Sequence, residues 1–340
     1  MSYLVRLEPF AVEFPCQDDE TVLEAAFKAG LSMRHGCKHG GCGACKVQVV
    51  EGYVEHNDHA TAISEEEIDS DIALLCCALP EEDLVLQLSD DYSEQELTPE
   101  FPVAQYTVTL EALNWVTHDI AHVVMRCNTD QNFKFSSGQY LEVSKAEEGQ
   151  WRAFSMANAD GDSRLIELLI KQIPSGYFSH YLKNEAKPGD ALEIRGPYGQ
   201  FGVVDTHAPI IMIAGGSGMA PIMSMLRQLA AEKSLREIVF FYGARTQRDL
   251  FWGAQIRSLA ADLENFNYYP ALSNPEDDLW AGEVGLITDV VRRITPESLR
   301  NSEGYLCGPP GMIDAAVDVL KDKGMFSSRI RFDKFLTTAG

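Results

Sequence analysis

Residues 34–55 read RHGCKHGGCGACKVQVVEGYVE and place three cysteines, Cys37, Cys42 and Cys45, in one short loop before an alternating, strand-like run. Glycines at 36, 40, 41 and 43 remove side-chain bulk, so the backbone can wrap closely around a bound group. Thiolates gathered in one loop of a chain without an export signal indicate metal ligands before disulfides. The stretch therefore predicts a metal-binding loop that leads into a strand at 46–50.

The cysteine spacing separates iron from zinc. The three cysteines follow C-x4-C-x2-C, and a fourth comes about thirty residues later, which is the spacing of a plant-type [2Fe–2S] cluster. A four-cysteine zinc site prefers two C-x2-C pairs, and the second pair is missing because Cys76 and Cys77 are adjacent. A Rieske centre, suggested by His39 two residues after Cys37, needs a later C-x2-H, but Leu79 occupies that position.

Composition limits the class of protein. The chain has 340 residues, 45% of them hydrophobic, which indicates a globular protein of two or three domains. The N-terminus has no signal-peptide pattern and no apolar run approaches the roughly 18 residues of a membrane span, so we expect a cytoplasmic protein without a membrane anchor. The net charge of −23 argues against nucleic-acid binding.

The acidic residues are concentrated in the first third of the chain. Residues 1–98 hold 21 Asp and Glu against 5 Lys and Arg. This surface is either a solvated face that aids solubility or a docking surface for a basic partner, because a field of one sign raises encounter rates.

The pattern of predicted elements divides the chain into three blocks. Residues 1–98 read strand, strand, helix, cysteine loop and strand, and the polar stretch 90–102 reads as a linker. Residues 99–206 carry short strands around one helix at 177–183, which predicts an antiparallel barrel. Residues 207–340 alternate strands with helices, including helices expected at 221–232 and 250–263, and predict a parallel α/β sheet.

The first block resembles a plant-type ferredoxin domain, which implies a β-grasp fold. The family's fourth cysteine stands four residues before a proline, and Pro80 selects Cys76 rather than Cys77. The ligands implied by the resemblance are Cys37, Cys42, Cys45 and Cys76. His35 and His39 are then loop residues and not ligands.

The second block contains Trp151-Arg152-Ala153-Phe154-Ser155, preceded by Gly138-Gln139-Tyr140 and closed by Arg195-Gly-Pro-Tyr-Gly199. Together these motifs resemble the flavin barrel of the ferredoxin–NADP reductase superfamily. The resemblance implies FAD, rather than FMN, with Arg152 at the pyrophosphate and Ser155 near the flavin N5 edge. The other implied contacts are Ala153, Phe154, where the family usually has Tyr, and the helix start at Gly176 and Ser179.

The third block carries two glycine turns, Gly215-Gly-Ser-Gly-Met-Ala-Pro221 and Cys307-Gly-Pro-Pro310, each at a strand-to-helix junction. The first is not a standard G-x-G-x-x-G, because Pro221 replaces the third glycine. The pair resembles the Rossmann-like nicotinamide-nucleotide domain of the same superfamily. The implied coenzyme contacts are Gly215, Gly216, Ser217, Gly218, Met219, Cys307, Gly308 and Pro309. The implied catalytic residues are Ser155, Cys307 and the C-terminal aromatic Phe335.

The coenzyme preference is read from the residues after the second strand of that block. Arg245 and Arg248 are basic, but the serine of NADP-specific members is missing and Asp249 would repel a 2′-phosphate. We therefore expect NADH.

The order of the three domains, ferredoxin, flavin barrel and nucleotide domain, resembles the reductase components of bacterial multicomponent oxygenases. Stretches at 112–117, 152–158, 196–201 and 312–316 look most similar to the reductases of soluble diiron monooxygenases. The resemblance implies electron flow from NADH through FAD and the cluster to the oxygenase component, with the acidic first block facing that partner. The reductase of a Rieske ring-hydroxylating dioxygenase is the alternative, and a flavin and iron–sulfur redox sensor is a more distant one.

Overall fold

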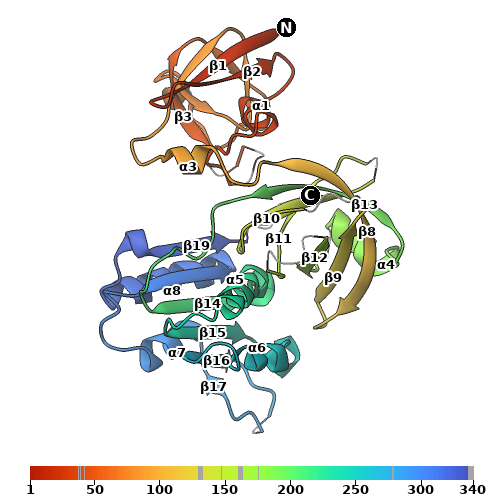
Figure 1. Ribbon diagram of the computed structural model, residues 1–340, viewed down its shortest axis with the longest axis vertical. Coiled ribbons are helices and arrows are strands. Elements are labelled where there is room, and N and C mark those ends of the chain that lie inside the picture. Colours follow the sequence, from red (N-terminus) through yellow and green to blue (C-terminus); the bar gives the residue numbers. More distant parts are fainter. Residues whose placement is uncertain are drawn as a thin grey trace. The chain divides into compact units, whose positions relative to one another are not determined.

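The computed structural model describes residues 1–36, 38, 40–41, 43–128, 133–146, 148–159, 164–174, 176–277 and 279–335 (Figure 1). The chain divides into two compact units. The first comprises Met1–Ala104 with Gly196–Gly199, and the second comprises Gln105–Arg195 with Gln200–Gly340. Among the described residues, no helix has the length and apolar character that a membrane crossing requires.

The first unit is built on a five-stranded mixed sheet in the order β2-β1-β7-β3-β5. The sheet strands are β1 (Ser2–Glu8), β2 (Val12–Gln17), β3 (Lys46–Glu51), β5 (Ile72–Leu74) and β7 (Leu84–Gln87), and β4 (Val54–His56) pairs separately with β6 (Ala78–Pro80). The helices are α1 (Val22–Lys28), α2 (Glu65–Ile68) and α3 (Glu94–Leu97). The side chain of Thr21 caps α1 by accepting the Glu24 N–H at 3.3 Å, and five residues of α1 are buried. The cysteine loop lies between α1 and β3.

The first half of the second unit is a six-stranded antiparallel sheet in the order β11-β10-β13-β8-β9-β12. Its strands are β8 (Ala104–Trp115), β9 (Ile120–Cys127), β10 (Tyr140–Lys145), β11 (Arg152–Ser155), β12 (Leu165–Lys171) and β13 (Ala191–Tyr198), with α4 (Tyr177–Asn184) between the last two. A bridge between Met156 and Leu168 joins the two edges. The sheet is therefore close to a closed barrel, as predicted.

The second half is a parallel sheet in the order β17-β16-β15-β14-β18-β19 (Figure 1). Its strands are β14 (Ile210–Gly215), β15 (Ile238–Ala244), β16 (Phe266–Leu272), β17 (Glu283–Val284), β18 (Glu303–Gly308) and β19 (Ile330–Lys334). Its helices are α5 (Met219–Ala231), α6 (Gly253–Leu259), α7 (Ile287–Ile294) and α8 (Pro310–Asp322), with short 3-10 turns η1 (Gly216–Gly218), η2 (Gln247–Asp249) and η3 (Ser327–Arg329).

Both faces of this parallel sheet are buried. Along β14, Ile210 and Met212 belong to a core shared with α5 and α6, whereas Ile211 and Ile213 belong to a core shared with α7 and α8. Alternate residues of a strand point to opposite faces, so a continuously apolar strand is required here. The first of these cores also takes in Ile120 and Leu169 of the barrel, so the two halves of the second unit are packed together.

The motif around Arg152 follows β10 and itself forms a strand, β11, which the sequence did not predict. Two sequence expectations need correction. Helix α6 is shorter than 250–263, since Trp252 adopts a left-handed backbone with φ +54°, which a continuous helix cannot contain. The stretch 90–102 is not a free linker, because it includes α3 and is bonded back onto the first unit.

Candidate functional site

The cluster loop has two predicted ligands that the structure describes and two that it does not. Cys37 and Cys42, with His39, lie outside the described residues. Cys45 and Cys76 are both buried, and the backbone N–H of Cys76 donates to the Cys45 Sγ at 3.4 Å. A hydrogen bond from Cys45 lowers the pKa of the Cys76 thiol to about 6, and the Gly40 backbone adds to the effect. The thiolate is the form that binds iron, so these residues fit a [2Fe–2S] cluster.

Cys77 is a buried neighbour of this pair. Its sulfur lies 3.8 Å from the sulfur of Cys76, and it is 1% exposed. Gly40 approaches it closely: a Cβ on Gly40 would lie 2.8 Å from the Cys77 sulfur and 2.0 Å from the His59 carbonyl oxygen, at φ +81°. Only glycine can occupy this position, which explains one of the loop glycines in physical terms.

The flavin motif is assembled from β11 and α4. Arg152 and Ser155 start and end β11, and the Phe154 ring lies 5.4 Å from the Phe178 ring of α4, centroid to centroid. The Ser179 hydroxyl accepts the Ile173 backbone N–H at 2.9 Å, which fixes the turn before α4. The structure thus brings the two predicted halves of the FAD motif side by side.

A buried polar atom at this place fits a bound group. Among the residues that the structure describes, the Tyr177 hydroxyl is one of few buried side-chain polar atoms without a hydrogen-bond partner. It follows Gly176 directly, at the N-terminal end of the eight-residue α4. A buried hydroxyl without a partner is costly, and a phosphate or ribose oxygen of FAD is suited to satisfy it.

The sequence analysis missed a support of this motif. The Arg195 guanidinium pairs with Glu142, which is 7% exposed, and lies 4.4 Å from the centroid of the Trp151 ring. Glu142 stands opposite Ala153 in the register of β10 and β11. The pairing of Arg195 with Glu142 therefore fixes β10, the strand next to Arg152. Its signal in the sequence was a charged residue, Glu142 or Arg195, within each of two otherwise apolar strands.

The two glycine turns of the nucleotide domain meet at the carboxyl ends of β14 and β18. These strands pair in parallel, with Ala214 opposite Cys307. A Cβ on Gly218 would lie 2.2 Å from the Cys307 carbonyl oxygen, and a Cβ on Gly308 would lie 2.9 Å from the Gly215 carbonyl oxygen. The two turns are therefore packed backbone against backbone, with no room for a side chain between them, as their glycine content requires.

The predicted catalytic residues Cys307 and Phe335 are close neighbours. The Phe335 backbone N–H donates to the Gly308 carbonyl oxygen at 3.0 Å. Cys307 is fully buried, and burial, with a smaller effect of Asp333, raises the pKa of its thiol well above the usual value. It is therefore a neutral thiol. The placement of Ser155 beside these two residues stays a prediction.

Asp333 is a second residue that the sequence analysis missed. It stands opposite Cys307 in the register of β18 and β19, and burial raises the pKa of its carboxyl to about 6. Its signal in the sequence was its position two residues before Phe335, in a strand that otherwise reads as an ordinary edge strand.

The turn read for coenzyme preference is an ordered cap. Asp249 accepts the backbone N–H of Thr246 at 2.8 Å and its hydroxyl at 3.2 Å, and it lies 3.5 Å from His118 Nδ1. The carboxylate therefore holds the turn that carries Arg245 and Arg248, in addition to contributing its negative charge.

Three known families match consecutive stretches of the chain. Residues 5–81 match the 2Fe-2S iron-sulfur cluster binding domain, residues 107–202 the oxidoreductase FAD-binding domain, and residues 212–318 the oxidoreductase NAD-binding domain. The reductase component of propane 2-monooxygenase from Rhodococcus jostii (strain RHA1) is 34% identical over 341 residues, which covers 98% of this chain and 92% of the relative. The chain belongs to the ferredoxin–NADP reductase superfamily, in the group with an N-terminal [2Fe–2S] domain.

Solved structures support the same membership over the whole chain. The Amycolatopsis cytochrome P450 reductase GcoB is 30% identical with a TM-score of 0.88 and covers 98% of both chains. The ferredoxin reductase in carbazole 1,9a-dioxygenase is 30% identical with a TM-score of 0.81 and covers 99% of both chains. As a member of this superfamily the protein is an oxidoreductase that binds a [2Fe–2S] cluster, FAD and NADH.

Proposed function

We propose that this reductase passes electrons from NADH through FAD and the [2Fe–2S] cluster to the oxygenase component of a multicomponent monooxygenase, with a diiron hydroxylase as the expected partner. One observation carries the proposal: a single chain holds all three cofactor domains in the same order as a propane 2-monooxygenase reductase component along 98% of its length. Bound FAD accepts the hydride electron pair of NADH and releases the two electrons singly, which a one-electron cluster can accept.

The residues of the chain position these groups. Arg152, Ser155, Gly176 and Ser179 are proposed to hold FAD, and the Gly215–Met219 and Cys307–Pro309 turns to admit NADH. Cys307 is proposed to flank the nicotinamide, where burial keeps its thiol protonated so that it does not act as a base. Phe335, tied to Gly308, is proposed to cover the flavin ring.

An anaerobic visible spectrum tests the core of the proposal. The purified protein should show overlapping flavin and iron–sulfur bands, and both should bleach when NADH is added. NADPH at the same concentration should bleach them more slowly. A colourless, zinc-containing protein, or bands that only dithionite bleaches, would contradict it.

Paired serine variants test the proposed ligand set of Cys37, Cys42, Cys45 and Cys76. Cys76→Ser should lower the bound iron and sulfide, whereas Cys77→Ser, which alters a thiol just as buried, should leave them unchanged. The reverse result would assign the fourth ligand to Cys77.

Docking is proposed to use the acidic ferredoxin domain, since residues 1–98 contain 21 acidic and 5 basic residues. Salt should then slow turnover with the oxygenase and leave direct ferricyanide reduction nearly constant. Equal salt dependence of the two activities would contradict electrostatic docking.

The reductase of a ring-hydroxylating dioxygenase stays the second candidate, because the carbazole 1,9a-dioxygenase reductase has the same domains and a TM-score of 0.81. Reduced protein mixed in turn with a diiron hydroxylase, a Rieske oxygenase and a cytochrome P450 distinguishes these partners by which one is reduced. We also infer a cytoplasmic location, because a reducing compartment keeps cysteine ligands such as Cys45 and Cys76 in the thiolate form that binds iron.

A further inference from the structure

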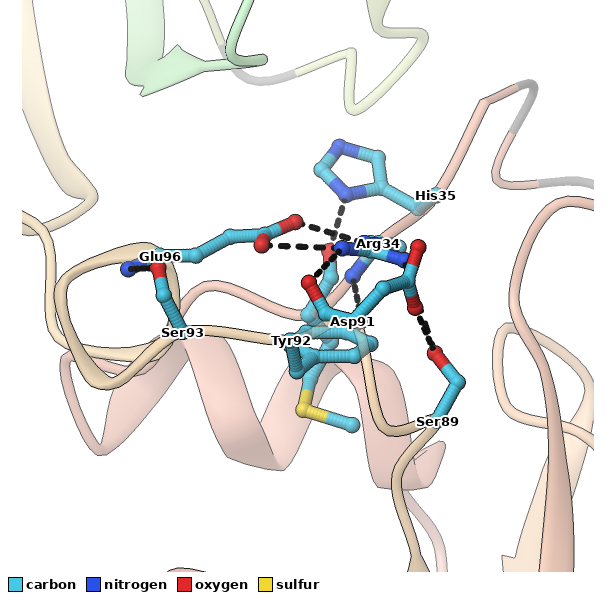
Figure 2. A network of polar contacts seen from close by, with 8 residues as sticks. Arg34, His35, Ser89, Asp91, Tyr92, Ser93 and Glu96 are labelled. Atoms are coloured by element: carbon cyan, nitrogen blue, oxygen red, sulfur yellow. Dashed lines mark hydrogen bonds and ion pairs between the residues drawn. The ribbon is translucent and has the colours of Figure 1, made fainter. Parts of the chain in front are cut away.

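Arg34 lies three residues before Cys37 and binds a segment more than fifty residues away in the sequence (Figure 2). Its Nε donates to one oxygen of Glu96 at 2.5 Å and its Nη2 to the other at 2.9 Å. Its Nη1 donates to the Asp91 carboxylate at 2.9 Å, and its Nη2 to the Asp91 carbonyl oxygen at 3.0 Å. This is a forked guanidinium–carboxylate contact with a second acid at its side, the strongest geometry that arginine offers.

Backbone contacts of the same stretch reach the same segment. The Arg34 N–H donates to the Tyr92 hydroxyl at 2.6 Å, and the Ser32 N–H donates to the Leu97 carbonyl oxygen at 2.7 Å. The guanidinium carbon also lies 4.1 Å from the centroid of the Tyr92 ring. Residues 32–34 and 89–97 are therefore joined along their length. We call this set of contacts the Arg34 clamp.

The far side of the clamp is itself well ordered. Ser93 caps α3 by accepting the Glu96 N–H at 3.1 Å, and the Ser89 hydroxyl donates to Asp91 at 2.6 Å. This segment is the last ordered part of the first unit before the chain passes, at Ala104, to the flavin barrel. A displacement of that connection would act on residues 32–36 through the clamp.

The near side of the clamp reaches the cysteine loop. Arg34 and Tyr92 line a groove of about 550 Å³ that extends to Ala44, the residue before Cys45. His35, the next residue toward Cys37, is held as well, because its Nδ1 lies 2.7 Å from the Met33 carbonyl oxygen. The clamp therefore borders the loop at both of its ends.

We propose that Arg34 is a positioning residue for electron transfer: it fixes the entry of the cluster loop to the segment that leaves the ferredoxin domain. The step it serves transfers one electron from reduced FAD to the oxidised cluster, with no bond made or broken. This inference rests on the proposed function. Because a small displacement between reacting groups costs a large factor in rate, loosening the clamp should slow this step and leave hydride transfer unchanged.

Two variants that remove charges of opposite sign distinguish a positioning role of Arg34 from a purely electrostatic effect on the cluster. Arg34→Met removes the cation, and Glu96→Gln removes one anion with little change of shape. If Arg34 acts by position, both variants break the fork and slow cluster reduction, by about fivefold for couplings of the usual size. If only the charge mattered, the two variants would change the rate in opposite directions. Arg34→Lys keeps the charge without the fork and should fall between wild type and Arg34→Met.

The experiment is stopped-flow reduction of the cofactor-loaded protein by NADH, with flavin and cluster followed at separate wavelengths. Arg6→Met is the matched control, since Arg6 lies in the same unit and pairs with Glu8 at 2.7 Å on β1. It should leave both phases unchanged. Hydrogen exchange of residues 32–36 gives a second readout, and it should rise in Glu96→Gln but not in Arg6→Met.

The outcomes separate the two proposals. A wild-type protein whose cluster NADH does not reduce would contradict the proposed function. A wild-type protein that behaves as proposed, with unchanged cluster rates and unchanged exchange in Glu96→Gln, would overturn the inference. Opposite effects of the two charge variants, or equal slowing of the flavin and cluster phases, would also overturn it.

Discussion

Two arginines each fix a connecting segment, one in each unit, and their surroundings differ. Arg236 donates to the carbonyl oxygens of Ala208 at 2.7 Å and Val204 at 3.0 Å, and to Glu303 at 2.8 Å. Its side chain is 8% exposed and that of Glu303 is 5% exposed. The Arg34 side chain is 34% exposed, and its partners Glu96 and Asp91 are 14% and 75% exposed.

The difference is one of burial, which sets how much each arginine stabilises the connection that it holds. Glu303 also accepts hydrogen bonds from Tyr305 at 2.9 Å and Thr206 at 3.2 Å, so the Arg236 network is satisfied without water. Water can replace Asp91 as a partner of Arg34 at lower cost than it can replace any partner of Arg236. We therefore expect both arginines to hold their connections, with Arg236 contributing more to stability than Arg34.

The largest effect is expected from Arg236→Met. It leaves Glu303 buried without its cation, which costs about 3–5 kcal/mol of unfolding free energy. Thermal unfolding at fixed cofactor concentration measures the loss in the second unit. Adding Glu303→Leu in the same chain should recover part of it; a double variant less stable than the single one would show that Glu303 is held by its other donors alone.

The next effect concerns the half-buried carboxyl of Asp333, whose raised pKa has desolvation as its cause and no ion pair among the described residues to offset it. The pKa of Asp333 is raised from 3.8 to about 6, so the folded protein binds this proton more tightly than the unfolded chain. Stability therefore falls as pH rises from about 4 to above 6. Asp333→Asn removes this dependence and should add of the order of 2 kcal/mol at pH 7. Parallel melting curves of the two proteins between pH 5 and 8 would contradict the assignment.

A smaller effect is expected from Arg34→Met. Loss of the fork to Glu96 should lower the stability of the ferredoxin domain by about 1–2 kcal/mol, reduced by the partial exposure of the pair. The thermal loss of cluster absorbance measures it. A loss as large as that of Arg236→Met would show that both connections are equally rigid, and the comparison would fail.

The smallest effect is expected from Lys46→Met. Lys46 contacts both oxygens of Glu67 at 2.6 and 2.8 Å, yet it is 29% exposed and its partner 40% exposed. Exposed pairs of this kind contribute little, so the melting temperature should stay within error at moderate salt. A clear drop in melting temperature would mean that the contribution of such an ion pair to stability depends on its proximity to the cysteine loop rather than on its burial.

The sequence predicted the elements whose signal is local. The glycine turns and the apolar strands of the nucleotide sheet follow from short-range patterns, and the structure forms them where expected. The cysteine spacing is also a short-range pattern, and the match to the 2Fe-2S family agrees with it. The barrel was predicted as a string of short strands, but β11, which carries the motif around Arg152, was not among them.

What the sequence did not predict depends on contacts between distant residues. The stretch 90–102 reads as a linker because it is polar. Two of its polar residues, Asp91 and Glu96, are instead the hydrogen-bond acceptors of Arg34. Similarly, the position of Asp333 two residues before Phe335 does not reveal that it lies opposite Cys307, because that depends on the pairing of β18 with β19. The start of α6 was misjudged because the left-handed backbone of Trp252 is set by its surroundings and not by its own preference.

The crowding of the two glycine turns has a consequence for recombination between relatives. A Cβ on Gly215 would lie 2.7 Å from the sulfur of Met312, and one on Gly218 would lie 2.2 Å from the Cys307 carbonyl oxygen. Neither turn can then change shape without the other, although about ninety residues separate them in the chain. A chimera that takes the first turn from one parent and the second from another combines two turns that have not been selected to pack together. Crossovers before the first turn or after the second should therefore be tolerated, whereas crossovers between the two turns should not.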